Sequence, residues 1–146
     1  MSRAALRRAG ILFSIMAALS LFTGCSTFDS RWNQSDQRGR WEGTWTSRTC
    51  GHSGRLRCIM VNQKGPVAYF KAWYGGLFTF EYRLPLRIDR REGDICYFHG
   101  EADLGWLAGG VYRYEGRVGA GTLTSTYACT GDHGVFELQR PPDPPP

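Results

Sequence analysis

Apolar and polar side chains alternate without exception in the segment Phe78-Thr79-Phe80-Glu81-Tyr82-Arg83-Leu84. Successive side chains of a β-strand point to opposite faces, so an extended chain here carries four apolar side chains on one face and three polar ones on the other. The same alternation recurs around Leu56 and around Leu123. The pattern predicts an all-β protein in which one face of the sheet is buried.

Eight segments of the chain have this strand character, and short turn-forming stretches such as Gly75-Gly76 separate them. Short links force neighbouring strands to be antiparallel. Eight such strands close most economically into an up-and-down barrel, because closure removes both exposed edges. The alternative is a β-sandwich of two sheets. The predicted strands are residues 40–48, 55–62, 67–73, 78–89, 94–101, 110–117, 122–129 and 135–140.

The 146 residues suffice for one domain and are too few for two. Hydrophobic residues make up 42% of the chain and charged residues 21%, which are values of a globular protein. Arg3, Arg7 and Arg8 account for three of the 18 basic residues, and all 13 acidic residues lie after residue 24. Residues 25–146 therefore carry a net charge of only +2, which gives no reason to expect nucleic-acid binding.

The N-terminal residues have the order of an export signal. A short basic segment precedes an uncharged apolar run at residues 11–22, which is shorter than the ~20 residues that span a bilayer as a helix. The run ends in Leu21-Phe22-Thr23-Gly24-Cys25, which resembles the bacterial lipobox, where a small residue precedes the cysteine that becomes the lipidated N-terminus. The alternatives are an ordinary secretory signal and an uncleaved anchor.

This resemblance implies that residues 1–24 are removed and that Cys25 carries a diacylglycerol and an N-acyl chain, with no other cofactor expected. Acyl chains at ~0.8 kcal/mol per buried methylene would hold the protein on a membrane bilayer of the cell envelope. Ser26 stands where an aspartate would resemble an inner-membrane retention signal. We therefore expect the outer membrane, with the domain facing the periplasm or the cell surface.

Two segments flank the predicted barrel of residues 40–140. Residues 25–39 are rich in polar side chains and read as the lipidated N-terminus and a flexible tether. Residues 141–146 read Pro-Pro-Asp-Pro-Pro-Pro, which cannot pair in a sheet and predicts a disordered tail.

Gly39-Arg40-Trp41 opens the first predicted strand, and Arg140 closes the last. This arrangement resembles the lipocalin-like (calycin) barrels, in which a Gly-x-Trp begins the first strand and a basic residue near the end of the last strand stacks on the tryptophan. In a closed meander of eight strands the first and last are antiparallel neighbours, so Trp41 and Arg140 should meet at the closed end. Such cation–π stacking contributes about 0.5–2 kcal/mol.

Four cysteines remain after Cys25: Cys50, Cys58, Cys96 and Cys129. An even number in an exported chain predicts two disulfides, and four cysteines allow three connectivities. Cys50 and Cys129 each end a predicted strand near the same end of the barrel, which favours pairing them. This choice leaves Cys58 and Cys96 as a second bridge or as buried thiols. Sequential pairing, Cys50 with Cys58 and Cys96 with Cys129, is the alternative.

The loops after the first, third, fifth and seventh predicted strands emerge at one end of a meander. They bring His52, His133 and Asp132 to this end, and His99 lies just before the third of these loops. Histidine and carboxylate ligands suit several divalent metal ions, so a metal-dependent or enzymatic site is one interpretation. The other is that these residues are exposed turn residues. The chain has no His-Glu-x-x-His sequence, nucleophile elbow or phosphate loop.

The sequence thus favours a membrane-anchored lipoprotein whose barrel binds a small apolar ligand or a protein partner. A barrel of eight strands has room for side chains or for one small ligand, and the large side chains expected inside favour a filled interior. These are Met60, Phe80, Tyr82, Leu123 and Tyr127. The alternatives are the metal-dependent or enzymatic site and a lysozyme-inhibitor-like role, since small lipid-anchored inhibitors of this kind are similar in size and export signal.

Overall fold

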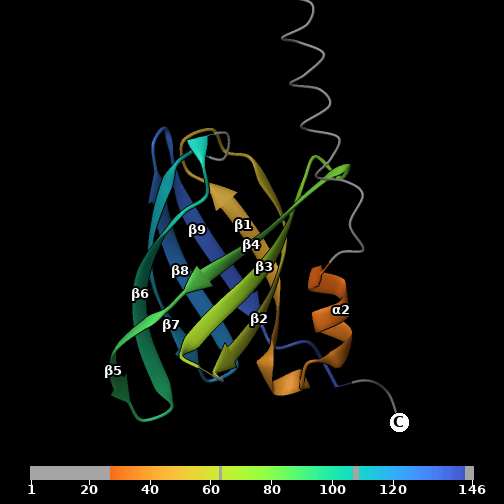
Figure 1. The fold of residues 1–146 in the computed structure, drawn as a ribbon, viewed down its shortest axis with the longest axis vertical. Coiled ribbons are helices and arrows are strands. Elements are labelled where there is room, and N and C mark those ends of the chain that lie inside the picture. The colour runs from red at the N-terminus through yellow and green to blue at the C-terminus, as the bar shows by residue number, and fades with distance from the viewer. Residues whose placement is uncertain (1–26, 63, 107–108, 144–146) are drawn as a thin grey trace, which may run out of the picture.

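Nine antiparallel strands form one sheet in the computed structural model, which describes residues 27–62, 64–106 and 109–143 (Figure 1). Their order in the sheet is β4-β3-β2-β1-β9-β8-β7-β6-β5. The strands are β1 (Arg40–Ser47), β2 (Ser53–Asn62), β3 (Pro66–Tyr74), β4 (Phe78–Pro85), β5 (Arg87–Glu92), β6 (Ile95–Asp103), β7 (Val111–Gly119), β8 (Thr122–Cys129) and β9 (Asp132–Gln139). The all-β prediction is confirmed, and the sandwich alternative is wrong because all nine strands share one sheet.

The first and last strands lie side by side, as the meander predicted. β1 and β9 pair antiparallel from Glu42 opposite Gln139 to Ser47 opposite Gly134. Two inward-facing glycines let these strands approach closely. A Cβ on Gly43 would lie 1.9 Å from the Glu137 carbonyl oxygen, and a Cβ on Gly134 would lie 2.1 Å from that of Thr46. The sheet therefore bends sharply at this junction.

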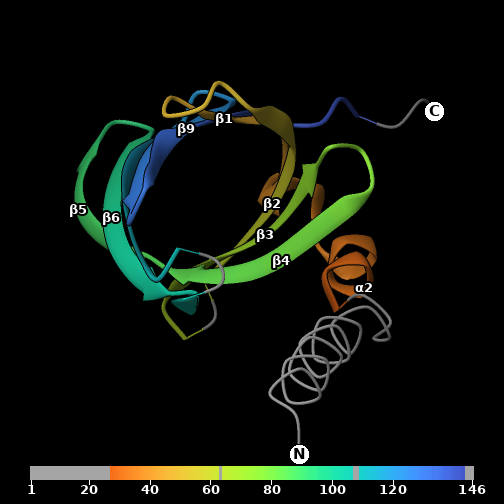
Figure 2. The ribbon, with the colours of Figure 1, turned by 90° about the horizontal axis from the view of Figure 1, so that it is seen from above.

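The sheet is a strongly curled half-barrel and not a closed barrel of eight strands (Figure 2). The single strand predicted at residues 78–89 is two strands, β4 and β5, divided at Pro85 and Leu86. β4 pairs with β3, whereas β5 pairs with β6, so these two strands form the open edges of the sheet. Proline has no N–H for a continued ladder, and the turn after it sends Leu86 into the core at 7% exposure.

The end of the half-barrel where β1 begins is closed and tightly packed. Trp41 is 2% exposed within a core that also contains Leu56, Phe70 and Leu138. The Arg140 guanidinium carbon lies 4.7 Å from the centroid of the Trp41 ring, so the contact expected from the sequence is present. We call this end of the molecule the base.

A helix replaces the flexible tether expected before the barrel. α2 (Thr27–Gln34) and the short 3-10 helix η1 (Gln37–Gly39) precede β1. Phe28 and Trp32 lie one helical turn apart with ring centroids 5.8 Å from each other, and Phe28 is 3% exposed. This pair gives α2 an apolar face, which covers the outer surface of the sheet and explains why the segment is ordered.

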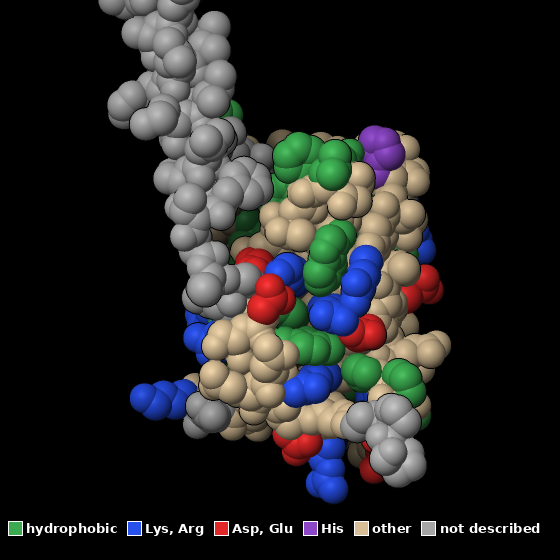
Figure 3. All heavy atoms as spheres, turned by 90° about the vertical axis from the view of Figure 1, so that its right-hand side faces the viewer, with side chains coloured by type: hydrophobic (Ala, Val, Ile, Leu, Met, Phe, Trp, Pro, Cys, Tyr) green, Lys and Arg blue, Asp and Glu red, His purple; other side chains and the backbone are tan. Residues whose placement is uncertain are grey.

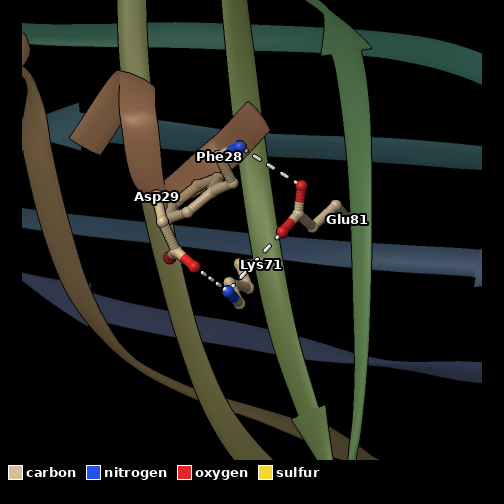
Figure 4. Close-up of polar contacts among 4 residues, drawn as sticks. All are labelled: Phe28, Asp29, Lys71 and Glu81. Carbon is tan, nitrogen blue, oxygen red and sulfur yellow. Dashed lines mark hydrogen bonds and ion pairs between the residues drawn. The ribbon is translucent and has the colours of Figure 1, made fainter. Parts of the chain in front are cut away.

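Polar contacts fix α2 against β3 and β4 (Figure 4). Lys71 Nζ lies 2.6 Å from Asp29 Oδ2 and 3.5 Å from Glu81 Oε1. The backbone N–H of Phe28 donates a hydrogen bond to Glu81 Oε2 at 3.2 Å. These contacts join the start of α2 to the middle of the two strands.

Candidate binding pocket at the mouth of the half-barrel

The end opposite the base is open, and we call it the mouth. The turns after β1, β3, β6 and β8 lie there, as the sequence predicted for alternate loops of a meander (Figure 1). Here the interior holds a pocket of about 440 Å³. Its walls are mainly apolar, formed by Trp45, Ala72, Tyr74, Phe80, Tyr82, Leu104, Tyr112, Tyr127 and Phe136. The interior is therefore filled at the base and hollow at the mouth, where several of the side chains expected to fill it instead line a cavity.

The pocket walls follow from strand periodicity. Trp45 lies four residues beyond the buried Trp41 on β1 and therefore on the same face of the strand, about 13 Å closer to the mouth. Its indole Nε1 donates a hydrogen bond to the Trp73 carbonyl oxygen at 3.0 Å, and its ring stacks on Tyr74 with centroids 5.6 Å apart. Gly54 leaves the space for this ring, because a Cβ there would lie 2.6 Å from Trp45 Nε1.

One side of the pocket is polar and centres on Asp132. Asp132 Oδ1 accepts a hydrogen bond from Ser47 Oγ at 2.6 Å, and Oδ2 accepts one from the Tyr127 hydroxyl at 3.0 Å. Burial alone would raise the pKa of Asp132, but the hydrogen bonds from Ser47, Tyr127, Thr49 and the backbone of His133 lower it. Burial together with the contact to Asp132 raises the pKa of Tyr127. The pocket thus presents an ionised carboxylate beside protonated phenols.

The β1–β2 turn adds a second polar group at the rim. The Cys50 thiol lies 3.3 Å from His52 Nδ1, and the Tyr74 hydroxyl lies 2.9 Å from the same nitrogen. Cys50 also donates through its backbone N–H and its thiol to Ser47 Oγ, both at 3.2 Å. This network connects the turn to Asp132 and holds it against the pocket.

Two of the three histidines lie at the mouth as the sequence predicted, His52 in the β1–β2 turn and His133 at the start of β9, but His99 does not. His52 lines the pocket, but His133 points to Thr49, whose Oγ1 lies 3.0 Å from His133 Nδ1. His99 lies on the outer face of β6, where its Nδ1 is 2.6 Å from Asp89 Oδ1 on β5. β6 extends to Asp103, so His99 is four residues before the strand end and faces outward.

The residues considered as metal ligands do not form one cluster. Among the described residues no group of three or more His, Cys, Asp or Glu side chains is close enough to hold a metal ion. His52 and Asp132 share the pocket wall, whereas His99 belongs to the outer surface of the sheet.

The predicted disulfides are absent, and all four described cysteines are free. Cys58 faces the core at the base, opposite Trp41, so it lies about 16 Å along β2 from the turn that carries Cys50. That separation exceeds the 4.4–6.8 Å between the Cα atoms of a disulfide. Cys96 lies on β6, separated from β2 by four intervening strands. Burial raises the pKa of the Cys58 thiol well above its usual value.

Cys50 and Cys129 both lie at the mouth, as predicted, but they face different neighbours. The Cys50 thiol contacts Ser47 and His52, whereas the Cys129 thiol lies 3.9 Å from the Thr130 carbonyl oxygen. Cys129 also contacts the position that a Cβ on Gly109 would occupy.

The segment with the lipobox, residues 1–26, lies outside the described residues, and so does the predicted modification of Cys25. Within the described residues, no helix has both the length and the hydropathy needed to cross a membrane. At the other end of the chain, residues 141–143 form no strand, and the Gln37 side chain contacts Pro142 and Asp143.

The pocket was only partly predictable from the sequence. The alternation of residues 78–84 places Phe80 and Tyr82 on the inner face, as observed. It does not indicate that Phe80 lies at the rim, with 56% of its surface exposed. The hydrogen bond between Ser47 and Asp132 was not predicted, because it joins residues 85 positions apart in the sequence. The chain matches no protein-family model, no curated protein and no solved structure.

Proposed function

We propose that this protein is a lipid-anchored lipoprotein of the bacterial cell envelope, held at the outer membrane through Cys25, and that its half-barrel binds a small apolar ligand in the mouth pocket. The observation that carries the proposal is the contrast between a packed base and a hollow mouth lined by aromatic rings. A volume of about 440 Å³ is within the range of pockets for small molecules. Such pockets combine apolar walls with a few placed polar groups, as here.

The charge of the pocket limits the kind of ligand. Asp132 lies in the pocket wall and is ionised at neutral pH, and its lowered pKa favours the ionised form further. A carboxylate brought into the same cavity would be repelled, whereas an ammonium or hydroxyl group could bind to Asp132. We therefore infer an amphiphile with a short apolar chain and a cationic or neutral head group.

The first experiment measures binding of the neutral fluorescent probe N-phenyl-1-naphthylamine to the purified full chain. Ala72→Phe places a ring inside the pocket and should weaken binding at least about tenfold, a loss of about 1.4 kcal/mol. Phe80→Ser removes an apolar wall at a half-exposed position, where folding is little affected, and should also weaken binding. Thr79→Phe, on the exposed face of the same strand, is the matched control and should bind normally. Equal affinity in all four proteins would exclude the mouth pocket as the binding site.

The second experiment displaces the probe with decylamine or decanoic acid, which share the chain length. Decylamine should compete at least about tenfold better, because only its head group complements Asp132. In Asp132→Asn this preference should disappear while probe binding persists. A preference for decanoic acid in the unaltered protein would contradict the inferred head group.

A further inference from the structure

Exposed apolar side chains gather at the mouth. Among the described residues seven large apolar side chains are exposed, and six of them lie in the β3–β4 hairpin or in or beside the β6–β7 connection. Leu77 and Trp106 are each 85% exposed, and Phe78 is 52% exposed. The others at this end are Tyr74, Phe80 and Val111, and the exception is Ile88 on β5.

The two segments border the same pocket. Tyr74 and Phe80 come from the hairpin, Leu104 and Tyr112 come from the two sides of the β6–β7 connection, and all four line the cavity. Figure 3 shows hydrophobic side chains at the upper, mouth end of the face that carries α2. Exposed apolar side chains on two sides of a cavity entrance favour contact with a protein or a membrane, because an isolated soluble domain gains nothing by exposing them.

The direction of α2 helps to decide whether the partner of this surface is a protein or a membrane. Asp29 contacts Lys71, whereas Arg31, further along the helix, lies over Tyr69, which precedes Lys71 on β3. The helix therefore runs opposite to β3, and since β3 ends at the mouth, α2 begins on the mouth side (Figure 1).

The spacing along the chain places the predicted anchor near the rim. Lys71 lies three residues before Tyr74, about 10 Å along β3. The helix rises about 3 Å from Asp29 to Thr27, and the two residues before Thr27 span up to about 7 Å when extended. Cys25 can therefore reach the level of Tyr74, and acyl chains on Cys25 would bring the mouth to the bilayer.

We propose that the rim of the mouth docks on the lipid bilayer, with Leu77, Phe78 and Trp106 inserted at the boundary between head groups and acyl chains. Aromatic and leucine side chains are those that membrane interfaces accept. The pocket then opens toward the membrane, and its ligand is an amphiphile that enters from the bilayer without crossing water. The docking rests on the lipid anchor of the proposed function, and the entry of the ligand rests in addition on the proposed pocket.

The test uses the full chain, bound to vesicles of phosphatidylethanolamine and phosphatidylglycerol whose acyl chains are brominated. Bromine quenches tryptophan only at short range, so emission from Trp106 should fall relative to vesicles without bromine. Trp106→Phe should remove most of this quenching. The control is Trp73→Phe, since Trp73 lies on the outer face of β3 within 6 Å of Arg55, Arg57 and Lys71, and this variant should keep the quenching.

A second variant protects the test against an indirect effect of losing Trp106. Leu77→Asp combined with Phe78→Asp changes only exposed side chains, so the fold should persist while Trp106 quenching falls at least about twofold. Quenching that is equal in the unaltered chain and in Trp106→Phe, or that the double variant leaves unchanged, would overturn the docking proposal. The same double variant should bind N-phenyl-1-naphthylamine in solution within about twofold of normal. Failure of docking therefore leaves pocket binding intact, and failure of pocket binding leaves the quenching intact.

Discussion

Arg140 lies over the ring of Trp41 at the junction of the first and last strands, and this contact closes the base. Arg140→Ala removes the cation but leaves the buried ring in place. We expect a loss of about 0.5–2 kcal/mol in the free energy of unfolding, measured by urea denaturation. Arg117→Ala, at an exposed position on β7, is the control and should change stability by less than about 0.5 kcal/mol. Equal effects of the two substitutions would show that the stacking contributes nothing specific.

Asp132 gives the molecule a pH dependence whose sign follows from its lowered pKa. A carboxylate with a lower pKa in the folded state stabilises the fold above its unfolded pKa of about 3.9, and that stability is lost as the pH falls through the folded value. Asp132→Asn should therefore melt below the unaltered protein at pH 6, and the difference should shrink between pH 4 and pH 2.

Ser47→Ala provides the companion measurement, because Ser47 donates the 2.6 Å hydrogen bond that lowers the Asp132 pKa. It should reduce the pH-dependent part of the melting difference, and combining it with Asp132→Asn should add little. A difference that stays constant from pH 6 to pH 2 would contradict the lowered pKa of Asp132.

At the scale of elements, the bend between β1 and β9 depends on glycines, because a residue with a side chain would not fit there. A Cβ on Gly43 would lie 1.9 Å from the Glu137 carbonyl oxygen, and backbone cannot move aside as a flexible side chain can. Gly43→Ala should lower the free energy of unfolding by about 1–3 kcal/mol in the same urea assay. Thr44→Ala, on the exposed face of the same strand, should lower it by less than half as much. A neutral Gly43→Ala would mean that the two strands are further apart than described.

The helix α2 is the element that the sequence missed, and its attachment can be tested separately. Phe28 is the buried anchor at 3% exposure, so Phe28→Ala should free the helix while the sheet remains folded. Hydrogen exchange of the amides in residues 29–34 should quicken at least about tenfold, with protection of the amides in β8 unchanged. Ser30→Ala, at an exposed position, should leave exchange unchanged. Unchanged exchange in Phe28→Ala would show that the helix does not depend on this contact.

The elements that the sequence predicted are those with local sequence signals. Alternation and glycine-rich turns are local signals, and they gave Thr122–Cys129 with its observed bounds. The break at Pro85 was missed because the alternation of residues 78–84 leads smoothly into it, and only the change of partner from β3 to β6 reveals two strands. α2 was missed because its apolar face consists of only two residues, Phe28 and Trp32, in a polar segment.

At the scale of the molecule, one sheet provides both a packed core and a pocket, because its two ends are packed differently. Large side chains meet at the base around Trp41, whereas at the mouth Tyr82 and Phe136 line a cavity. The sequence identifies inward-facing positions but not how far apart the facing walls lie, since that distance depends on how tightly the sheet curls. The same limit applies to the predicted cysteine bridges and histidine cluster, which assumed a regular closed barrel.

The proposed function depends most directly on the mouth pocket, and one measurement tests whether the pocket holds a ligand. Isotope-edited NOE spectra of the ¹³C-labelled full chain with unlabelled decylamine, in perdeuterated detergent, report which side chains lie within about 5 Å of the ligand. We expect contacts from the methylene chain to the rings of Phe80, Tyr82 and Phe136, and from the carbon next to the amine to residues around Asp132. Contacts only with outer-face rings such as Trp73 or Tyr97, or none with the pocket at saturating decylamine, would contradict binding in the mouth pocket.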